Sequence, residues 1–235
     1  MKKIKKLAFF DQDNTIYQGF SMHDFYLFMA DNQYVGRWIY DQHIKIQNLY
    51  REGKLNYRQA GQQVIQLTAD ALAGKNIKEV AKIGKKFLRN GEKIFSWVKP
   101  VLKFLEKNNF ETYIISASAE PVVKAVGEHI QIGNYFASLL EIKDGYYTGK
   151  VINYLDFEEK QKKIKKILGK NSHRLLKIGF GDSTGDIDML SEMNQAFIIN
   201  PHQKEILDLA KKRGWLVAQE AKTIIEEIKK TLKEA

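Results

Sequence analysis

The sequence predicts an α/β fold in which a Rossmann-like, wound and mostly parallel sheet is covered by helices. Three observations support this prediction. Short apolar runs alternate along the chain with segments of helical periodicity. Acidic or hydroxyl residues stand within two positions of the end of three of these runs, at Asp11, Ser116 and Asp182. Residues 16–96 interrupt the alternation with helical spacing alone, which predicts a helical cap inserted after the first strand.

The predicted strands follow one another along the chain. Five apolar runs of strand length lie at residues 7–10, 112–115, 175–180, 196–200 and 215–218. Two further runs, 136–141 and 146–151, flank a short turn segment that contains Asp144 and Gly145. This spacing predicts a hairpin.

These elements predict two domains. Residues 1–15 and 97–235 are expected to form the α/β core, and residues 16–96 the helical cap. Within the cap, apolar residues at helical spacing, such as Phe25 and Met29, are interpreted as core.

Asp11 and Asp13 directly follow the apolar run 7–10. If that run is a buried strand, both carboxylates lie at its carboxyl end, where open α/β sheets bind ligands. Two acids so close repel each other, and burying them without compensation is costly, so a bound divalent cation would resolve the conflict. The alternative is a turn in which the aspartates only satisfy neighbouring backbone groups.

A second acidic cluster, with Asp182 and Asp186, follows the apolar run 175–180. In the functional interpretation Asp182 contributes to a Mg²⁺ site, because Mg²⁺ takes hard oxygen ligands from one or two carboxylates and keeps waters and substrate phosphate for the rest. In the structural alternative Asp182 or Ser183 only caps the following helix.

Ser116 follows the apolar run 112–115, and Pro121 predicts that a helix starts soon afterwards. Backbone N–H groups at the start of that helix could join Ser116 in holding an anion. Ser118 is interpreted as the N-cap of the same helix.

Residues 158–168 are rich in lysine, and such a charge run on a helix is usually a solvated face. At about 100° per residue, Ile164 and Leu168 belong to the inward stripe, and Lys160 projects nearer to its centre than the other lysines do. Lys160 is therefore predicted to point inward, with its ammonium towards the strand ends.

The chain carries 38 basic and 28 acidic residues, which leaves a net charge of +10. Such a charge favours an anionic partner, either a nucleic acid or a small anionic substrate. The basic residues are interleaved with Glu and apolar positions, and no basic tract has the aromatic residues suited to stacking bases. A nucleic acid is therefore not the expected partner.

The 235 residues can bury a sizeable core, and they include no cysteine, which excludes disulfides and thiolate metal sites and is compatible with a reducing cytoplasm. The basic residues 1–6 resemble the start of a signal peptide, but the apolar run after them ends at Asp11, too early for an export core. No segment has the length and apolarity of a membrane span. We therefore expect a cytoplasmic protein with no membrane partner; the sequence does not predict the oligomeric state.

Four motifs occur in a fixed order: Asp11-x-Asp13-x-Thr15, Ser116, Lys160 and Gly181-Asp182-x-x-x-Asp186. Their order and spacing resemble the haloacid dehalogenase-like (HAD) phosphohydrolase superfamily. Residues 116–119, 144–149 and 196–201 are similar to its branch related to phosphoserine phosphatase. The resemblance spans residues 7 to about 201, apart from the cap.

The resemblance implies an enzyme, a phosphatase that hydrolyses a small phosphomonoester through an aspartyl-phosphate. It implies Asp11 as the nucleophile, and Asp13 as the group that protonates the leaving oxygen and later deprotonates the attacking water. Ser116 and Lys160 are implied to bind the phosphoryl oxygens.

The same resemblance implies Mg²⁺ as the cofactor. The ion would be held by the Asp11 side chain, the Asp13 backbone carbonyl and Asp182, with Asp186 nearby in a supporting role. The implied partner is a small phosphorylated metabolite. In the related phosphatases an insertion at the place of residues 16–96 covers the site, so substrate identity is expected to depend mostly on the cap.

Two departures from the phosphoserine phosphatase pattern bear on the substrate. Ser116 is followed by Ala117 and Ser118 instead of a glycine pair, and residues 17–22 lack the acidic residue expected to hold a substrate amine. Phosphoserine itself is therefore disfavoured as the substrate.

The other polar and aromatic candidates in the cap have structural interpretations. Phe20 is interpreted as packing, and Arg51 and Arg58 as surface charge. His23 and His43 are interpreted as surface residues.

Two alternatives remain open. In the first, the protein is a phosphotransferase in which an alcohol, instead of water, accepts the phosphoryl group from Asp11. In the second, it is a non-catalytic, basic nucleic-acid-binding protein on the same fold, whose binding would be sensitive to salt.

Overall fold

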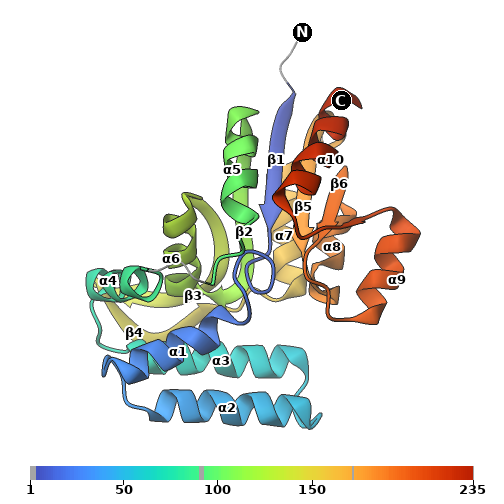
Figure 1. Cartoon of the computed structure of the whole chain (residues 1–235). Coiled ribbons are helices and arrows are strands. Elements are labelled where there is room, and N and C mark those ends of the chain that lie inside the picture. The colour runs from blue at the N-terminus through green and yellow to red at the C-terminus, as the bar shows by residue number, and fades with distance from the viewer. Residues whose placement is uncertain (1–3, 90–92, 171, 235) are drawn as a thin grey trace.

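The computed structural model describes residues 4–89, 93–170 and 172–234, and these form a seven-stranded sheet with helices on both faces (Figure 1). The strands are β1 (Lys5–Phe10), β2 (Phe110–Ala119), β3 (Asn134–Lys143), β4 (Tyr146–Asn153), β5 (Leu175–Gly181), β6 (Gln195–Ile198) and β7 (Leu216–Val217). The helices are α1 (Ser21–Asp31), α2 (Trp38–Arg51), α3 (Tyr57–Leu72), α4 (Ile77–Phe87), α5 (Val98–Lys107), α6 (Glu120–Ile130), α7 (Phe157–Leu168), α8 (Ile187–Ser191), α9 (Lys204–Arg213) and α10 (Ala221–Glu234). The first half of the basic segment 1–6 lies outside the described residues.

The strand order is β4-β3-β2-β1-β5-β6-β7. Strands β3 and β4 pair antiparallel, and every other neighbouring pair is parallel. The chain moves outward from β1 in one direction and then returns to β5 and moves outward in the other. The order therefore reverses between β1 and β5, the position at which wound sheets bind ligands. The predicted fold class is confirmed.

Residues 7–10 of β1 alternate between the two faces of the sheet and are buried on both, because each face is covered by a packed cluster. Ala8 and Phe10 pack in the core under α5, α6 and α10, whereas Leu7 and Phe9 pack in the core under α7, α8 and α9. The register pairs Phe10 with Phe180 of β5, and their rings stack with centroids 4.4 Å apart. This register aligns the carboxyl ends of β1 and β5.

Helices α1–α3 lie beyond the carboxyl ends of the central strands (Figure 1). Their inward residues join residues of α4, α6, β3 and β4 in a second cluster, in which Phe25 and Met29 are fully buried, as predicted. Helix α3 begins after a capping box formed by Asn56 and Gln59. The helical spacing of residues 16–96 thus corresponds to helices, and we propose that this segment is a cap domain on the α/β core.

Some strand ends differ from the prediction. Strand β2 continues past Ile115 to Ala119, with an irregular register between these two residues. Strands β6 and β7 are shorter than predicted, because β7 pairs with β6 through only two residue pairs. The predicted hairpin is formed by β3 and β4, and Asp144 and Gly145 in its turn both have positive φ.

None of the helices within the described ranges is long and apolar enough to cross a bilayer.

Candidate active site

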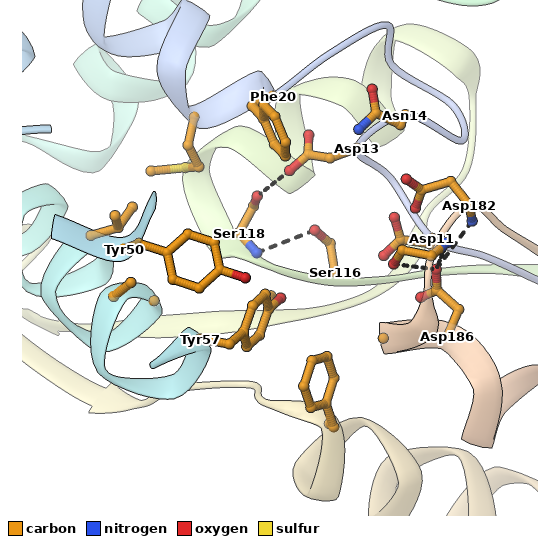
Figure 2. A pocket seen from close by; sticks show the side chains of 18 of the residues that line it. Asp11, Asp13, Asn14, Phe20, Tyr50, Tyr57, Ser116, Ser118, Asp182 and Asp186 are labelled. Carbon is orange, nitrogen blue, oxygen red and sulfur yellow. Dashed lines mark hydrogen bonds between the residues drawn. The ribbon is translucent and has the colours of Figure 1, made fainter. Parts of the chain in front are cut away.

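Asp11 follows β1 and Asp182 follows β5, the two strands between which the strand order reverses. The backbone N–H of Asp11 donates to the carbonyl oxygen of Phe180 at 2.9 Å. This hydrogen bond keeps the carboxyl ends of β1 and β5 aligned. One carboxylate oxygen from each of Asp11, Asp182 and Asp186 lies within 4.8 Å of the others (Figure 2). We call these three residues the acidic cluster.

Asp186 reaches the acidic cluster because the chain after β5 folds into a short 3-10 turn, Thr184–Asp186. Its Oδ2 accepts hydrogen bonds from the backbone N–H groups of Asp182 at 3.2 Å and Ser183 at 3.3 Å. Ser183 caps only this turn, whereas the cap position of the following helix α8 is Asp186, so neither Asp182 nor Ser183 caps that helix. Asp182 itself points into the cavity beside Asp11.

Lys160 is buried at the start of α7, and the prediction that it points inward is confirmed. The helix begins after Asp156, whose Oδ1 accepts from the Glu159 backbone N–H at 3.0 Å. From there the Lys160 Nζ lies 2.8 Å from Asp11 Oδ1 and 3.6 Å from Asp186 Oδ1.

With all three carboxylates ionised, the acidic cluster would carry more negative charge than Lys160 balances. Burial, together with the charge of Asp11, raises the pKa of Asp182 to about 9. Burial also raises the pKa of Asp11, although Lys160 opposes the shift. For Lys160, burial disfavours the charge, but Asp11 and Asp186 outweigh this effect and raise its pKa. Closely spaced carboxylate oxygens with surplus negative charge fit a hard divalent cation.

Asp13 has both carboxylate oxygens hydrogen-bonded. Oδ1 accepts from the Ser21 backbone N–H at 2.8 Å, and Oδ2 accepts from the Ser118 hydroxyl at 2.9 Å. The interpretation of Ser118 as an N-cap is therefore wrong: Ala119 occupies the cap position of α6, and the Ser118 hydroxyl is engaged by Asp13 instead.

Ser116 lies in the irregular part of β2, where its side chain is 2% exposed. Its Oγ accepts from the Ser118 backbone N–H at 3.2 Å. Such irregularities often re-aim a side chain next to a functional site. A cavity of about 600 Å³ is lined by all six residues predicted for the site: Asp11, Asp13, Ser116, Lys160, Asp182 and Asp186.

The cap supplies cavity residues that the sequence did not single out, above all Tyr50 and Tyr57. Two interpretations of cap residues are wrong. Phe20, expected to pack, is 60% exposed at the cavity, and His43, expected at the surface, is only 4% exposed where it lines the cavity. The sequence gives only a weak signal for Tyr50 and Tyr57. An aromatic residue outside the apolar face of a helix is expected to be an ordinary surface residue unless another segment packs against it.

The fold and this site together define a class of protein: an α/β enzyme with an acidic cluster that could hold a cation at the carboxyl edge of its parallel sheet. The model of the haloacid dehalogenase-like hydrolase family matches residues 8–191. The chain belongs to this family of hydrolases.

Relatives and solved structures agree with the family. Phosphoserine phosphatase SerB1 of Mycobacterium tuberculosis (strain ATCC 25618 / H37Rv) is 23% identical over 217 residues, which cover 88% of this chain and 68% of that protein. A Bordetella pertussis Tohama I protein of unknown function superposes with a TM-score of 0.76 at 21% identity, over 92% of this chain and 98% of the other. A phospho-aspartyl intermediate analogue of phosphoserine phosphatase superposes with a TM-score of 0.65 at 22% identity, over 96% and 99% of the two chains. These structures share the fold.

Proposed function

We propose that the protein is a Mg²⁺-dependent phosphatase that hydrolyses a small phosphomonoester through an aspartyl-phosphate on Asp11. The observation that supports the proposal most is the meeting of the acidic cluster and Lys160 where the strand order reverses. The family match and a phosphoserine phosphatase among the relatives point in the same direction.

In the first half of the proposed reaction, a carboxylate oxygen of Asp11 attacks phosphorus, and the bond from phosphorus to the ester oxygen breaks. Asp13 gives its proton to that oxygen, so the leaving group departs as an alcohol. Burial raises the pKa of Asp13, which favours the protonated form that this step needs.

In the second half, Asp13 accepts a proton from a water molecule whose oxygen attacks phosphorus. The bond between phosphorus and the Asp11 oxygen breaks, and inorganic phosphate leaves. The net reaction consumes one ester and one water and yields one alcohol and one phosphate. Asp13 ends in the protonated form in which it began.

Lys160 and Ser116 are assigned to the phosphoryl oxygens. The Lys160 ammonium has three donors, so it can hold Asp11 and a phosphoryl oxygen together. The Mg²⁺ would be held by the side chains of Asp11 and Asp182 and by the Asp13 backbone carbonyl, with Asp186 supporting the Asp182 backbone. When bound, Mg²⁺ supplies positive charge for the phosphoryl oxygens.

The proposal is tested by measuring phosphate release from a panel of phosphomonoesters with Mg²⁺ and with EDTA. We expect release only with Mg²⁺, and a loss of at least about a thousandfold in Asp11→Asn. Asp208→Asn on the exposed side of α9 is the matched control and should retain activity. A hydroxylamine-sensitive phosphoryl label should form on the wild type and not on Asp11→Asn. Full activity of Asp11→Asn would refute the nucleophile assignment.

The same assay separates hydrolysis from phosphoryl transfer. With alcohol acceptors added, a hydrolase releases phosphate in the same amount as the alcohol product of the substrate. A deficit of free phosphate, matched by a new phosphate ester of the acceptor, would identify a phosphotransferase instead.

A further inference from the structure

The cavity continues from the acidic cluster to the cap. Its volume of about 600 Å³ lies within the range of about 300–1,000 Å³ that pockets for small organic ligands occupy. Room therefore remains beside a phosphoryl group for a leaving group larger than a serine side chain. Four large aromatic residues line that room: Phe20, Tyr50 and Tyr57 come from the cap (Figure 2), and Phe157 comes from the start of α7. We call these four residues the aromatic lining.

The aromatic lining is open to solvent although its members are large and apolar. Phe20, Tyr50, Tyr57 and Phe157 are 60%, 47%, 42% and 37% exposed. The rings of Tyr57 and Phe157 stack with centroids 4.5 Å and planes 17° apart, and Tyr50 meets Tyr57 edge-on at 6.5 Å. Accessible aromatic side chains gathered around one cavity mark a surface that binds a ligand.

The cap side of the cavity is uncharged. Among the described residues that line it, those between 20 and 65 include no Asp, Glu, Lys or Arg. His43 is held neutral, because burial lowers its pKa to about 4. Arg58 stands next to Tyr57 in sequence, but its guanidinium pairs with Asp156 at 2.9 Å and Glu158 at 3.2 Å. A charged leaving group enclosed here would lose water without gaining a partner.

We infer that the leaving group is an uncharged alcohol that carries a flat ring, such as an aryl-methyl alcohol or a nucleoside, held against Tyr50 and Tyr57. The inference rests on the proposed phosphatase function and adds the substrate class. Aromatic faces attract flat rings, and the tyrosine hydroxyls can bind polar atoms on the ring. Phosphoserine lacks a ring, and its leaving group carries an ammonium and a carboxylate that the cap does not match.

Three phosphates of primary alcohols separate the effects of ring, size and charge: benzyl phosphate, cyclohexylmethyl phosphate and O-phosphoserine. The full chain is assayed with Mg²⁺, and acetyl phosphate serves as a small substrate without a ring. We expect kcat/KM for benzyl phosphate to exceed the values for cyclohexylmethyl phosphate and O-phosphoserine by about tenfold or more.

The variants Tyr50→Leu and Tyr57→Leu test the residues. Each should lower kcat/KM for benzyl phosphate by about tenfold relative to kcat/KM for acetyl phosphate. Tyr146→Leu is the matched control, because Tyr146 is 49% exposed on β4 and does not line the cavity. It should leave every substrate unchanged. The comparison of substrates on the wild type stands whether or not a variant folds.

The outcomes distinguish the inference from the proposed function. Turnover of O-phosphoserine at or above that of benzyl phosphate, with acetyl phosphate also hydrolysed, overturns the inference and leaves the phosphatase intact. Equal values for benzyl and cyclohexylmethyl phosphate overturn the requirement for a flat ring. No phosphate release from any compound, acetyl phosphate included, overturns the proposed function itself.

Discussion

Lys160 contacts two buried carboxylates, Asp11 at 2.8 Å and Asp186 at 3.6 Å, and its own side chain is 9% exposed. A buried ion pair contributes little net stability when complete, because desolvation offsets the attraction. Removing one partner is different, since the other charge then stays buried and uncompensated. At the scale of single residues, Lys160 is therefore a requirement for the folded acidic cluster as well as a candidate ligand for phosphate.

Lys160→Met keeps the length of the side chain and removes its charge. We expect the free energy of unfolding, measured by urea denaturation in EDTA near neutral pH, to fall by about 3–5 kcal/mol. Lys162→Met, which removes an exposed lysine paired with Glu159 on the same helix, should leave the free energy of unfolding nearly unchanged. Equal stability of the two variants would contradict the role of Lys160 in compensating buried charge.

Ser118 acts on Asp13 through the hydrogen bond at 2.9 Å, which favours the ionised carboxylate and so opposes the effect of burial on its pKa. In Ser118→Ala the pKa of Asp13 should rise further. Because the first step needs protonated Asp13, the basic limb of the kcat/KM profile should move to higher pH. Loss of orientation should lower kcat by about tenfold.

The pH profile is the decisive measurement for Ser118, because a merely structural role would lower activity without moving the limb. Ser118→Thr retains a hydroxyl at the same position and should restore the wild-type profile. An unshifted limb in Ser118→Ala would show that Ser118 does not tune Asp13.

At the scale of elements, helix α3 of the cap meets the segment that leads from β4 into α7. Tyr57 stacks on Phe157, and Arg58 pairs with Asp156. Gly61 also faces this segment, and a Cβ added to it would lie 1.9 Å from the Tyr154 hydroxyl oxygen. The absence of a side chain at Gly61 thus lets Tyr154 line the cavity between cap and core.

Gly61→Ala should displace the Tyr154 ring and reshape the cavity. We expect kcat/KM for benzyl phosphate to fall by about tenfold relative to acetyl phosphate. The helix itself gains from the change, since alanine favours a helix over glycine by roughly 0.5–1 kcal/mol, so the loss of activity should not come from unfolding.

The matched control for Gly61→Ala is Gly133→Ala, where an added Cβ meets nothing within 4 Å. Steady-state kinetics with both substrates and a thermal melt of each variant provide the comparison. An unchanged ratio of the two kcat/KM values in Gly61→Ala would contradict the role of the Tyr154 contact in shaping the cavity.

At the scale of the whole molecule, the buried carboxylates of the acidic cluster lower the stability of the folded protein without metal. A bound cation would offset this loss. Burial raises the pKa of Asp182 to about 9, above its unfolded value, and it raises the pKa of Asp11 as well. Between the unfolded and folded pKa values the native state holds more protons than the unfolded chain. The free energy of unfolding without metal therefore falls as pH rises through this window.

Bound Mg²⁺ takes the place of these protons, so its stabilising effect should grow with pH. We expect the rise in Tm on adding MgCl₂ in place of EDTA to be larger at about pH 8.5 than at about pH 6. Differential scanning calorimetry measures it. Asp182→Asn should abolish most of the rise, and a rise of equal size at both pH values would contradict the titration of the acidic cluster.

Much of the fold could be predicted because strand alternation and helical spacing are properties of neighbouring residues. Strand β1, the hairpin of β3 and β4 and the helical character of residues 16–96 follow from such local patterns. The ends of β2 and β7 could not be predicted, because the length of a strand depends on the neighbouring strand with which it pairs. Ser116 therefore came to lie within an irregular strand instead of after it.

As with the fold, part of the candidate site could be predicted from the sequence. Residues that follow parallel strands converge at one edge of a sheet, so the sequence alone predicts that Asp11 and Asp182 meet. The interpretations of His43, Phe20 and Ser118 are wrong, since the exposure and partners of these residues depend on segments distant in sequence. The Ser118 hydroxyl meets Asp13 across 105 positions of the chain.

Local sequence was enough to specify the strands, the helices and the order of the acidic motifs, because each depends on a few adjacent residues and on chain connectivity. The pairing of Lys160 with Asp11, 149 positions apart, and the aromatic lining of Tyr50, Tyr57 and Phe157 arise only after folding. Distance, burial and the local electric field are properties of segments brought together in space. They decide which carboxylates hold protons and which leaving group the cavity accepts.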